Sequence, residues 1–268
     1  MRLFYQSLGV SRRSETGPYA QKLRAILESA VAPGTAIEVF GLSPGRAIAD
    51  QYRYLEYLDT GEIIDNGLRA EREGYDAFLI GNIFEPGLHA LREVLNIPVI
   101  GLCEASVTLA CLMAPNFSVV NVNRKFARRV TENIASYGVS GRLVSIDRMT
   151  IERAAMFDEA FDDPAARDKV FDQFRAAARE GLAKGAEAVI PAGGIVMTLL
   201  ADAGIHEVDG APIVNGLLAL AKIGELAASL KALTGHFTSK RLTYAPPTGT
   251  LLADIRAAYG DQIYPGAR

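Results

Sequence analysis

The chain alternates between short apolar runs and longer segments in which apolar residues recur every three or four positions. The short runs are rich in Val, Ile, Leu and Phe and are bounded by Gly, Pro or Asn, a pattern typical of buried strands. The longer segments are typical of helices that cover one face of a sheet. This alternation predicts an α/β fold in which crossover helices join parallel strands. The expected strands form two sets of four: 3–6, 36–41, 77–81, 98–102, 117–122, 143–147, 188–191 and 212–215.

Two helices have clear local signals. At Asp163 and Pro164 a capping side chain precedes a proline in the first turn, and apolar residues then recur at helical spacing up to Gly185. A second helix is expected over residues 61–74, because a glycine follows the last periodic position and a strand comes next. Both helices fit the crossover role.

The sequence contains a weak internal echo. The segment EGYDAFLIGN, followed by IPVIGLCEASVTLA, matches KGAEAVIPAG, followed by APIVNGLLALA, in its order of glycines, strands and helices. The echo predicts two pseudo-symmetric lobes, each with a four-stranded parallel sheet flanked by helices. The first lobe is expected to span 1–114 and 218–268, and the second 115–217. Ligands bind at the carboxyl ends of parallel strands, so we expect the active site in the cleft between the lobes.

The links between the lobes can also be anticipated. We expect the chain to cross between the lobes at the helices that follow Gly101 and Gly216. Each of these helices follows the last expected strand of one of the two matching segments. The tail after His236 contains a helix signal around residues 251–258. We expect this tail to return and pack on the first lobe.

Composition narrows the class of protein. With 268 residues, 49% of them hydrophobic, the chain can bury a substantial core without disulfides. The formal net charge is -3 and no basic patch stands out, so nucleic acid is not an expected partner. No apolar run reaches the roughly 18 residues of a membrane span, and the N-terminus lacks a secretory signal. The two cysteines and three histidines lack metal-ligand spacing, so no metal site is expected. We expect a cytoplasmic homo-oligomer.

Four segments carry a resemblance to a known family. GNIFEPGLHALRE, IPVIGLCEAS, FSVVNVNRKF and DGAPIVNG resemble the hydantoin racemase branch of the aspartate/glutamate/hydantoin racemase superfamily, and the resemblance covers nearly the whole chain. It implies a pair of four-stranded parallel lobes, no cofactor, and proton abstraction and return at a carbon beside a carboxylate or carbonyl. The implied substrate is a small carboxylate or a cyclic amide such as a hydantoin. In most members, two cysteines transfer the proton from opposite faces.

This sequence departs from the two-cysteine pattern. The matching motifs place Asn82 and Ala192 where the cysteines stand, and a one-residue shift would place Gly193 at the second position. None of these side chains exchanges a proton at neutral pH. The resemblance therefore implies the anion-binding geometry of the loops, but the acid/base must be supplied by other residues.

Glu85 is the leading candidate for the base. It follows a strand end and opens a helix, where it is an indifferent N-cap, although a negative charge at a helix N-terminus is favourable by itself. His89 lies four residues later and would share a helix face with it, as an acid/base unit or as a surface ion pair.

The thiols are weaker candidates. Cys103 precedes a helix, whose amide dipoles can lower a thiol pKa. Its alternative is a small apolar side chain packed in the core, as free cysteines often are. Glu104 fits the first turn of that helix as a charge that balances the dipole. Cys111, two turns on, is expected in the core, with Cys103 nearer the cleft.

Other polar residues at strand ends are candidates for substrate binding. A guanidinium at Arg124 would suit a carboxylate, with the start of the next helix as its alternative partner. Glycines at strand ends let backbone amides approach an anion. The full set of expected binding residues is Tyr5, Gln6, Ser7, Ser43, Asn123, Arg124, Ala192, Gly193 and Gly194.

Three functions remain open on the sequence. The first is a cofactor-independent isomerase or racemase with a non-cysteine acid/base, which the resemblance favours. The second is a lyase such as a decarboxylase, because stabilising the same enolate then needs at most one proton donor. The third is a non-catalytic binder, which Asn82 and Ala192 would suit.

Overall fold

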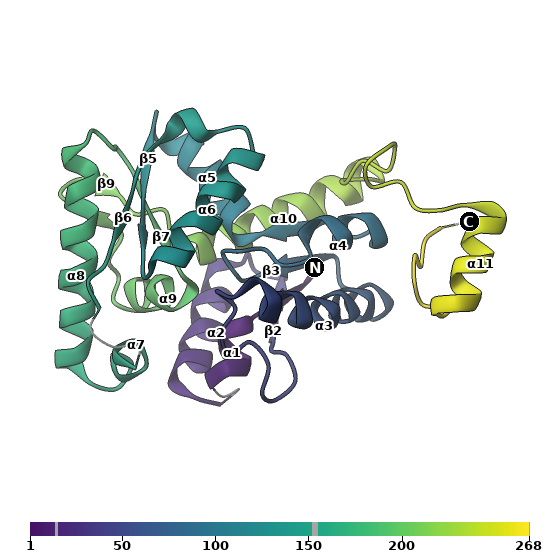
Figure 1. Ribbon diagram of the computed structural model, residues 1–268, viewed down its shortest axis with the longest axis horizontal. Coiled ribbons are helices and arrows are strands. Elements are labelled where there is room, and N and C mark those ends of the chain that lie inside the picture. Colours follow the sequence, from purple (N-terminus) through teal and green to yellow (C-terminus); the bar gives the residue numbers. More distant parts are fainter. Residues whose placement is uncertain (14–15, 152–154, 268) are drawn as a thin grey trace.

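The computed structural model describes residues 1–13, 16–151 and 155–267, and its longer strands form two parallel sheets in two adjoining lobes (Figure 1). The sheet of the first lobe has the order β2-β1-β3-β4. Its strands are β1 (Arg2–Gln6), β2 (Ala36–Phe40), β3 (Ala77–Ile80) and β4 (Val99–Gly101). All three pairings are parallel, so the four carboxyl ends lie on one edge. The α/β class and the two lobes are therefore confirmed.

The second sheet has three strands, in the order β6-β5-β7. They are β5 (Phe117–Asn121), β6 (Leu143–Arg148) and β7 (Val189–Ala192). The predicted fourth strand at 212–215 is wrong, because this segment makes only one bridge to the sheet, between Ile213 and Val189. Instead, β9 (Ala211–Pro212) pairs antiparallel with β8 (Glu207–Val208). Pro212 lacks the N–H that a ladder requires.

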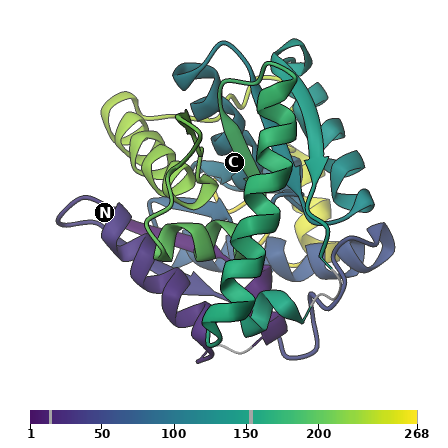
Figure 2. The same ribbon diagram turned by 90° about the vertical axis from the view of Figure 1, so that its left-hand side faces the viewer.

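The helices cover the faces of both sheets. Figure 2 shows the long α8 in front of the second sheet, on the outer side of that lobe. α8 starts as predicted, with the Asp163 carboxylate accepting a 2.9 Å hydrogen bond from the backbone N–H of Ala165. α3 begins earlier than predicted, since the mostly exposed stretch before residue 61 is also helical. The helices are α1 (Leu8–Arg13), α2 (Pro18–Ala30), α3 (Arg53–Arg72), α4 (Leu88–Val94), α5 (Leu102–Met113), α6 (Arg124–Ser136), α7 (Met156–Glu159), α8 (Pro164–Ala183), α9 (Gly194–Asp202), α10 (Gly216–Thr234) and α11 (Gly249–Tyr259).

α5 and α10 join the two lobes, as predicted. α10 packs on α5, α2 and β3 of the first lobe and also on α9 of the second, and α5 contacts β7. Two glycines permit this close packing. A Cβ at Gly216 would lie 2.3 Å from the Ser106 hydroxyl, and one at Gly224 would lie 2.7 Å from a Leu79 methyl group. The largest apolar cluster therefore runs without a break from one lobe to the other.

The C-terminal tail returns to the first lobe. The Lys240 ammonium donates to the backbone carbonyls of Arg92, Glu93 and Leu95 at 2.6 to 2.8 Å, and so caps the end of α4. Tyr264 adds a 2.7 Å hydrogen bond to the Glu93 carboxylate. In Figure 1, α11 stands to one side of the lobes. Within the described ranges, no helix combines the length and apolar character that crossing a membrane requires.

Candidate functional site

A cleft of about 250 Å³ lies where the carboxyl ends of both sheets meet. Loops that follow strands of both lobes line it. From the first lobe come Gly81 and Asn82 after β3, and from the second come Gly193 and Gly194 after β7. The two loops that the internal echo matches therefore face one cavity.

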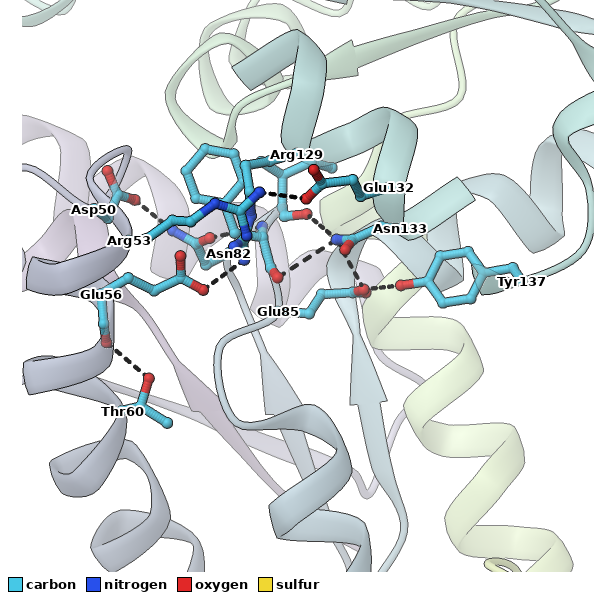
Figure 3. A network of polar contacts seen from close by, with 12 residues as sticks. Asp50, Arg53, Glu56, Thr60, Asn82, Glu85, Arg129, Glu132, Asn133 and Tyr137 are labelled. Carbon is cyan, nitrogen blue, oxygen red and sulfur yellow. Dashed lines mark hydrogen bonds and ion pairs between the residues drawn. The ribbon is translucent and has the colours of Figure 1, made fainter. Parts of the chain in front are cut away.

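The Asn82 side chain has a fixed orientation in the cleft. Its Nδ2 donates a 2.7 Å hydrogen bond to Oδ2 of Asp50, and its Oδ1 accepts one of 2.8 Å from the backbone N–H of Phe84 (Figure 3). Asp50 also lines the cleft, from the long loop between β2 and α3. Asp50 was not among the residues predicted for the cleft. The only local signal is that this loop leaves the carboxyl end of a strand, which by itself singles out no residue.

The opposite side of the cleft is the glycine turn after β7. Gly193 has a φ of 154°, which glycine adopts readily, and it precedes the first turn of α9. Tyr19, on α2, reaches this turn from the first lobe and also lines the cleft. Its hydroxyl lies 3.4 Å from the place that a Cβ on Gly194 would occupy. Ala192 is buried at the strand end and offers the cleft no polar group.

Asn123 lines the cleft as predicted, and it has a structural task as well. Its side chain accepts a 3.0 Å hydrogen bond from the backbone N–H of Phe126 and so caps α6. Arg124 is exposed on the first turn of α6, outside the residues that line the cleft. The rest of the wall is largely apolar: Leu8, Ile83, Val122, Phe126, Ile151, Phe157 and Ile195.

Tyr5 and Gln6 were expected in the cleft, but the structure places both below it. The Tyr5 ring is fully buried under Gly81, where a Cβ would lie 2.2 Å from the ring. Its hydroxyl has no hydrogen-bond partner among the residues that the structure describes, and burial raises its pKa well above the usual range. Gln6 is also fully buried, and its Oε1 accepts a 2.8 Å hydrogen bond from Asn66. Both side chains point into layers of packed helices.

Ser7 and Ser43 also lie outside the cleft, which corrects their expected role. The Ser7 hydroxyl accepts a 3.1 Å hydrogen bond from the backbone N–H of Val10, inside the buried start of α1. Ser43 is exposed, and its hydroxyl and backbone N–H both donate to the Glu62 carboxylate, at 2.9 and 2.6 Å. Each serine therefore stabilises a local turn.

Glu85 lies behind the cleft, in contrast to the prediction. Its backbone has a φ of 56°, and its carboxyl turns toward the start of α5, where it accepts a 2.8 Å hydrogen bond from the N–H of Glu104. The Tyr137 hydroxyl of α6 donates to the same carboxyl. Burial raises the pKa of Glu85 to about 8. It lines a second cavity, of about 280 Å³, instead of the cleft.

The expected pairing of Glu85 with His89 is absent. Glu85 precedes α4, which begins at Leu88, so the two side chains do not share a helix face. His89 is exposed and its Nδ1 lies 2.7 Å from the Tyr244 hydroxyl.

The two cysteines have the reverse of the predicted burial. Cys103 is 1% exposed in the core, outside the residues that line the cleft, and burial together with Glu85 raises its pKa well above the usual range. A neutral thiol is a poor base. Cys111 is half-buried, although the sequence predicted a core position. Glu104 has the structural use expected, since it pairs with Arg92 at 2.5 Å.

Polar contacts between α3 and α6 tie the lobes together beside the cleft (Figure 3). Arg129 pairs with Glu56 at 2.6 Å in a mostly buried position, and Arg53 pairs with Glu132 at 2.5 Å nearer the surface. Burial raises the pKa of Glu56, and this effect is larger than the lowering that the charge and hydrogen bond of Arg129 produce. Asn133 of α6 donates a 3.1 Å hydrogen bond to the carbonyl of Ile83, next to Asn82. The second lobe therefore helps to hold the loop that carries Asn82.

Among the residues that the structure describes, no group of three or more His, Cys, Asp or Glu side chains is arranged to hold a metal ion. Among the described residues that line the cleft, the polar side chains are three amides, one phenol and one carboxylate.

Comparison with known proteins places the chain in a family context. Residues 16–223 match the family described as Asp/Glu/Hydantoin racemase. A hydantoin racemase from Pseudomonas sp. (strain NS671) is 33% identical over 82% of this chain and 83% of its own length. Two solved structures share the fold. An allantoin racemase from Klebsiella pneumoniae has a TM-score of 0.74 at 22% identity, over 93% of this chain and 94% of its own. An allantoin racemase from Pseudomonas fluorescens has a TM-score of 0.73 at 24% identity, over 93% of this chain and 98% of its own.

Proposed function

The chain belongs to the Asp/Glu/hydantoin racemase family, and on that basis we propose that it is a cofactor-independent racemase with a non-cysteine acid/base. The reaction is removal and return of a proton at a carbon beside a carbonyl or carboxylate. The observation that carries the proposal is the shared cleft. Asn82 of the first lobe and the Gly193–Gly194 turn of the second line the same cavity.

The cleft suits an enolate intermediate. Backbone N–H groups at the start of α9 are free of intrahelical partners, and oriented amides of this kind stabilise developing negative charge. Asn82 and Ala192 stand where the family pattern has its two thiols. Neither can carry the proton at neutral pH, so the acid and the base come from neighbouring side chains.

The walls favour a small ring or chain that bears amide groups. The side-chain amides of Gln51, Asn82 and Asn123 line the cleft together with apolar residues such as Phe126 and Phe157. Amides offer both donors and acceptors, which match the N–H and C=O groups of a hydantoin-like ring. An apolar substituent on the reacting carbon would pack on the two phenylalanines. We therefore propose a hydantoin-like or amino-acid-derived substrate.

The test follows the reacting C–H bond. Single enantiomers of 5-methylhydantoin, 5-benzylhydantoin and alanine are incubated with the protein in D₂O, and NMR and chiral chromatography follow the products. A racemase incorporates deuterium at the reacting carbon while optical rotation falls to zero. Loss of carbon dioxide from an arylmalonate, with no racemisation of any compound, would point to a lyase. Binding without exchange or turnover would point to a binder and would end the racemase proposal.

The homo-oligomeric state and the cytoplasmic location belong to the same proposal. Leu226, Leu230 and Leu233 lie on one face of α10 and are 56%, 39% and 82% exposed, which supports contact with another copy. Two unpaired cysteines suit a reducing compartment. Sedimentation velocity and cell fractionation check the two statements. A monomer at micromolar concentration would contradict the first.

A further inference from the structure

We propose that the outer face of α3 pairs with the same face of a second copy of the chain about a two-fold axis, and that this contact holds in place the loop between β2 and α3 that lines the cleft. The pairing rests on the homo-oligomeric state proposed above, and it assigns a surface to that state. It holds whichever reaction the cleft performs.

The first two turns of α3 have their apolar and acidic side chains on reversed sides. Glu56 and Asp59 are buried within the chain. Tyr54, Tyr57 and Leu58 are 71%, 73% and 42% exposed. A helix that covers the sheet of a single chain normally turns its apolar side chains inward and its charges toward water. The reversal therefore favours a second protein surface against the outer face of α3.

The buried face of α3 holds the loop that precedes the helix. The Asp59 carboxylate accepts a 3.0 Å hydrogen bond from the backbone N–H of Ala47. The Glu62 carboxylate accepts the two hydrogen bonds of Ser43 described above. Ala47 and Asp50, both from this loop, line the cleft. A contact that fixes α3 therefore also fixes one wall of the cleft.

The exposed positions of α3 have the spacing of a seam between two helices. Tyr54, Leu58, Gly61 and Asp65 are all exposed and follow one another at intervals of four, three and four residues, which places them on one stripe. In an antiparallel pair whose two-fold axis passes between Leu58 and Gly61, Leu58 lies at the level of the partner's Gly61, where a small residue leaves it room.

The ends of the stripe are complementary as well. The same axis brings Tyr54 to the level of the partner's Asp65. A tyrosine hydroxyl is a hydrogen-bond donor and an ionised carboxylate is an acceptor, so this hydrogen bond forms twice, once on each side of the axis. The stripe therefore complements itself, as a two-fold contact requires.

The exposed apolar surface has the size of a small specific interface. If a fully exposed aromatic side chain presents about 200 Å², Tyr54, Tyr57 and Leu58 present about 350 Å² in one copy and about 700 Å² in two. Specific interfaces bury at least about 1,200 Å², of which roughly 57% is apolar. The two faces therefore supply the apolar share of such a contact, and the polar side chains around them supply the rest.

The first test measures the mass of the assembly. Leu58→Glu places a charge at the centre of the contact, so the folded variant should have half the mass of wild type by sedimentation velocity. This holds for a dimer and also for a tetramer in which the α10 leucines make the second contact. Leu112→Glu is the matched control, because Leu112 is an 80% exposed leucine of α5, and it should leave the mass unchanged.

A charge exchange tests the antiparallel pairing itself. Tyr54→Glu sets a like charge against the partner's Asp65 and should weaken association about tenfold or more. The double variant Tyr54→Glu/Asp65→Lys should recover association, because opposite charges then meet across the axis. The two positions lie about 16 Å apart along one helix, so recovery cannot come from a pair within one copy. A double variant that associates no better than Tyr54→Glu would overturn this pairing.

Hydrogen–deuterium exchange measures the effect on the loop. The backbone amides of residues 43–52 should exchange about tenfold faster or more in folded Leu58→Glu than in wild type, because local opening becomes easier once the contact is lost. Leu112→Glu should keep the wild-type rate. Equal rates in wild type and in a Leu58→Glu variant of halved mass would overturn the link between the contact and the cleft.

The outcomes separate this contact from the proposals above. If wild type assembles and folded Leu58→Glu keeps its mass, the α3 contact is overturned and the homo-oligomer stands. Tyr57→Glu replaces Leu58→Glu if circular dichroism shows that the latter does not fold. A wild-type monomer at every concentration would end both the homo-oligomer and the α3 contact, whereas the racemase proposal is decided separately by the exchange assay in D₂O.

Discussion

The carboxyl of Glu85 accepts a 2.8 Å hydrogen bond from the backbone N–H of Glu104, which joins the loop after β3 to the first turn of α5. The Tyr137 hydroxyl of α6 donates to the same carboxyl. One buried acid therefore holds together three elements, from both lobes, directly behind the loop that carries Asn82. This position makes Glu85 a support for the cleft.

The first prediction concerns the pH dependence of stability. Burial raises the folded pKa of Glu85 from its ordinary value of 4.5 to about 8, so the folded state holds a proton that the unfolded state releases. Stability from this group is fully present below about pH 4.5 and is lost as the pH rises toward 8. Glu85→Gln cannot ionise, so its free energy of unfolding should fall less between pH 5 and 8 than that of wild type. Urea unfolding at several pH values measures the difference. Glu180→Gln, on an exposed surface, should reproduce the wild-type slope; an equal slope for Glu85→Gln would contradict the prediction.

The second prediction compares the two ion pairs that connect α3 and α6. Arg129 and Glu56 have side chains 17% and 11% exposed, whereas Arg53 is 61% exposed and its partner Glu132 is 37% exposed. Arg129→Met leaves the Glu56 carboxylate buried without its partner and should cost about 3 kcal/mol. Arg53→Met breaks an exposed pair and should cost about 1 kcal/mol or less.

Urea unfolding of both variants is the measurement. The double variant Arg129→Met/Glu56→Gln should recover part of the loss, because the unpaired charge is gone. If Arg129→Met and Arg53→Met lowered the free energy of unfolding equally, burial of the Arg129–Glu56 pair would have no effect on stability and the prediction would be wrong.

The third prediction concerns the close contact of Gly81 with Tyr5. A Cβ at Gly81 would lie 2.2 Å from a ring that is fully buried and cannot move aside. Gly81→Ala should therefore lower stability by about 1–3 kcal/mol through overpacking. Gly61 is the matched control, because it is exposed within α3 and a Cβ there meets nothing within 4 Å. Gly61→Ala should raise stability by about 0.5–1 kcal/mol, as expected for a helical glycine. Thermal unfolding of both variants is the measurement. An unchanged melting temperature for Gly81→Ala would contradict the prediction.

The fourth prediction concerns thiol reactivity. Cys103 is 1% exposed and burial raises its pKa, while Cys111 is only partly buried. A thiol reagent such as DTNB should label Cys111 first, and Cys103 only as fast as the protein opens. Single variants Cys103→Ala and Cys111→Ala assign the two phases. Faster labelling of Cys103 would mean that this thiol is accessible from the cleft.

Local patterns in the sequence determined most of the fold. Seven of the expected strands appear within one or two residues of their predicted ends, because apolar runs and the glycines and prolines beside them act on the chain locally. The strand predicted at 212–215 is absent because of how this segment packs in the tertiary structure. Ile213 reaches β7 for only one bridge before Asn215 caps α10, accepting a 3.1 Å hydrogen bond from Leu217. The internal echo likewise placed Asn82 and Gly193 in one cleft.

The chemistry of the cleft was decided by contacts that no local pattern contains. Asp50 meets Asn82 from 32 residues away, and Tyr19 reaches the turn after Ala192 from the other lobe. Glu85 had the right place in the sequence for a base, yet its left-handed backbone and the N–H of Glu104 turn its carboxyl away from the cleft. A sequence determines where a strand ends, because hydrophobic periodicity is local. Which side chains meet beyond that end depends on how distant segments pack, and only the tertiary structure decides that.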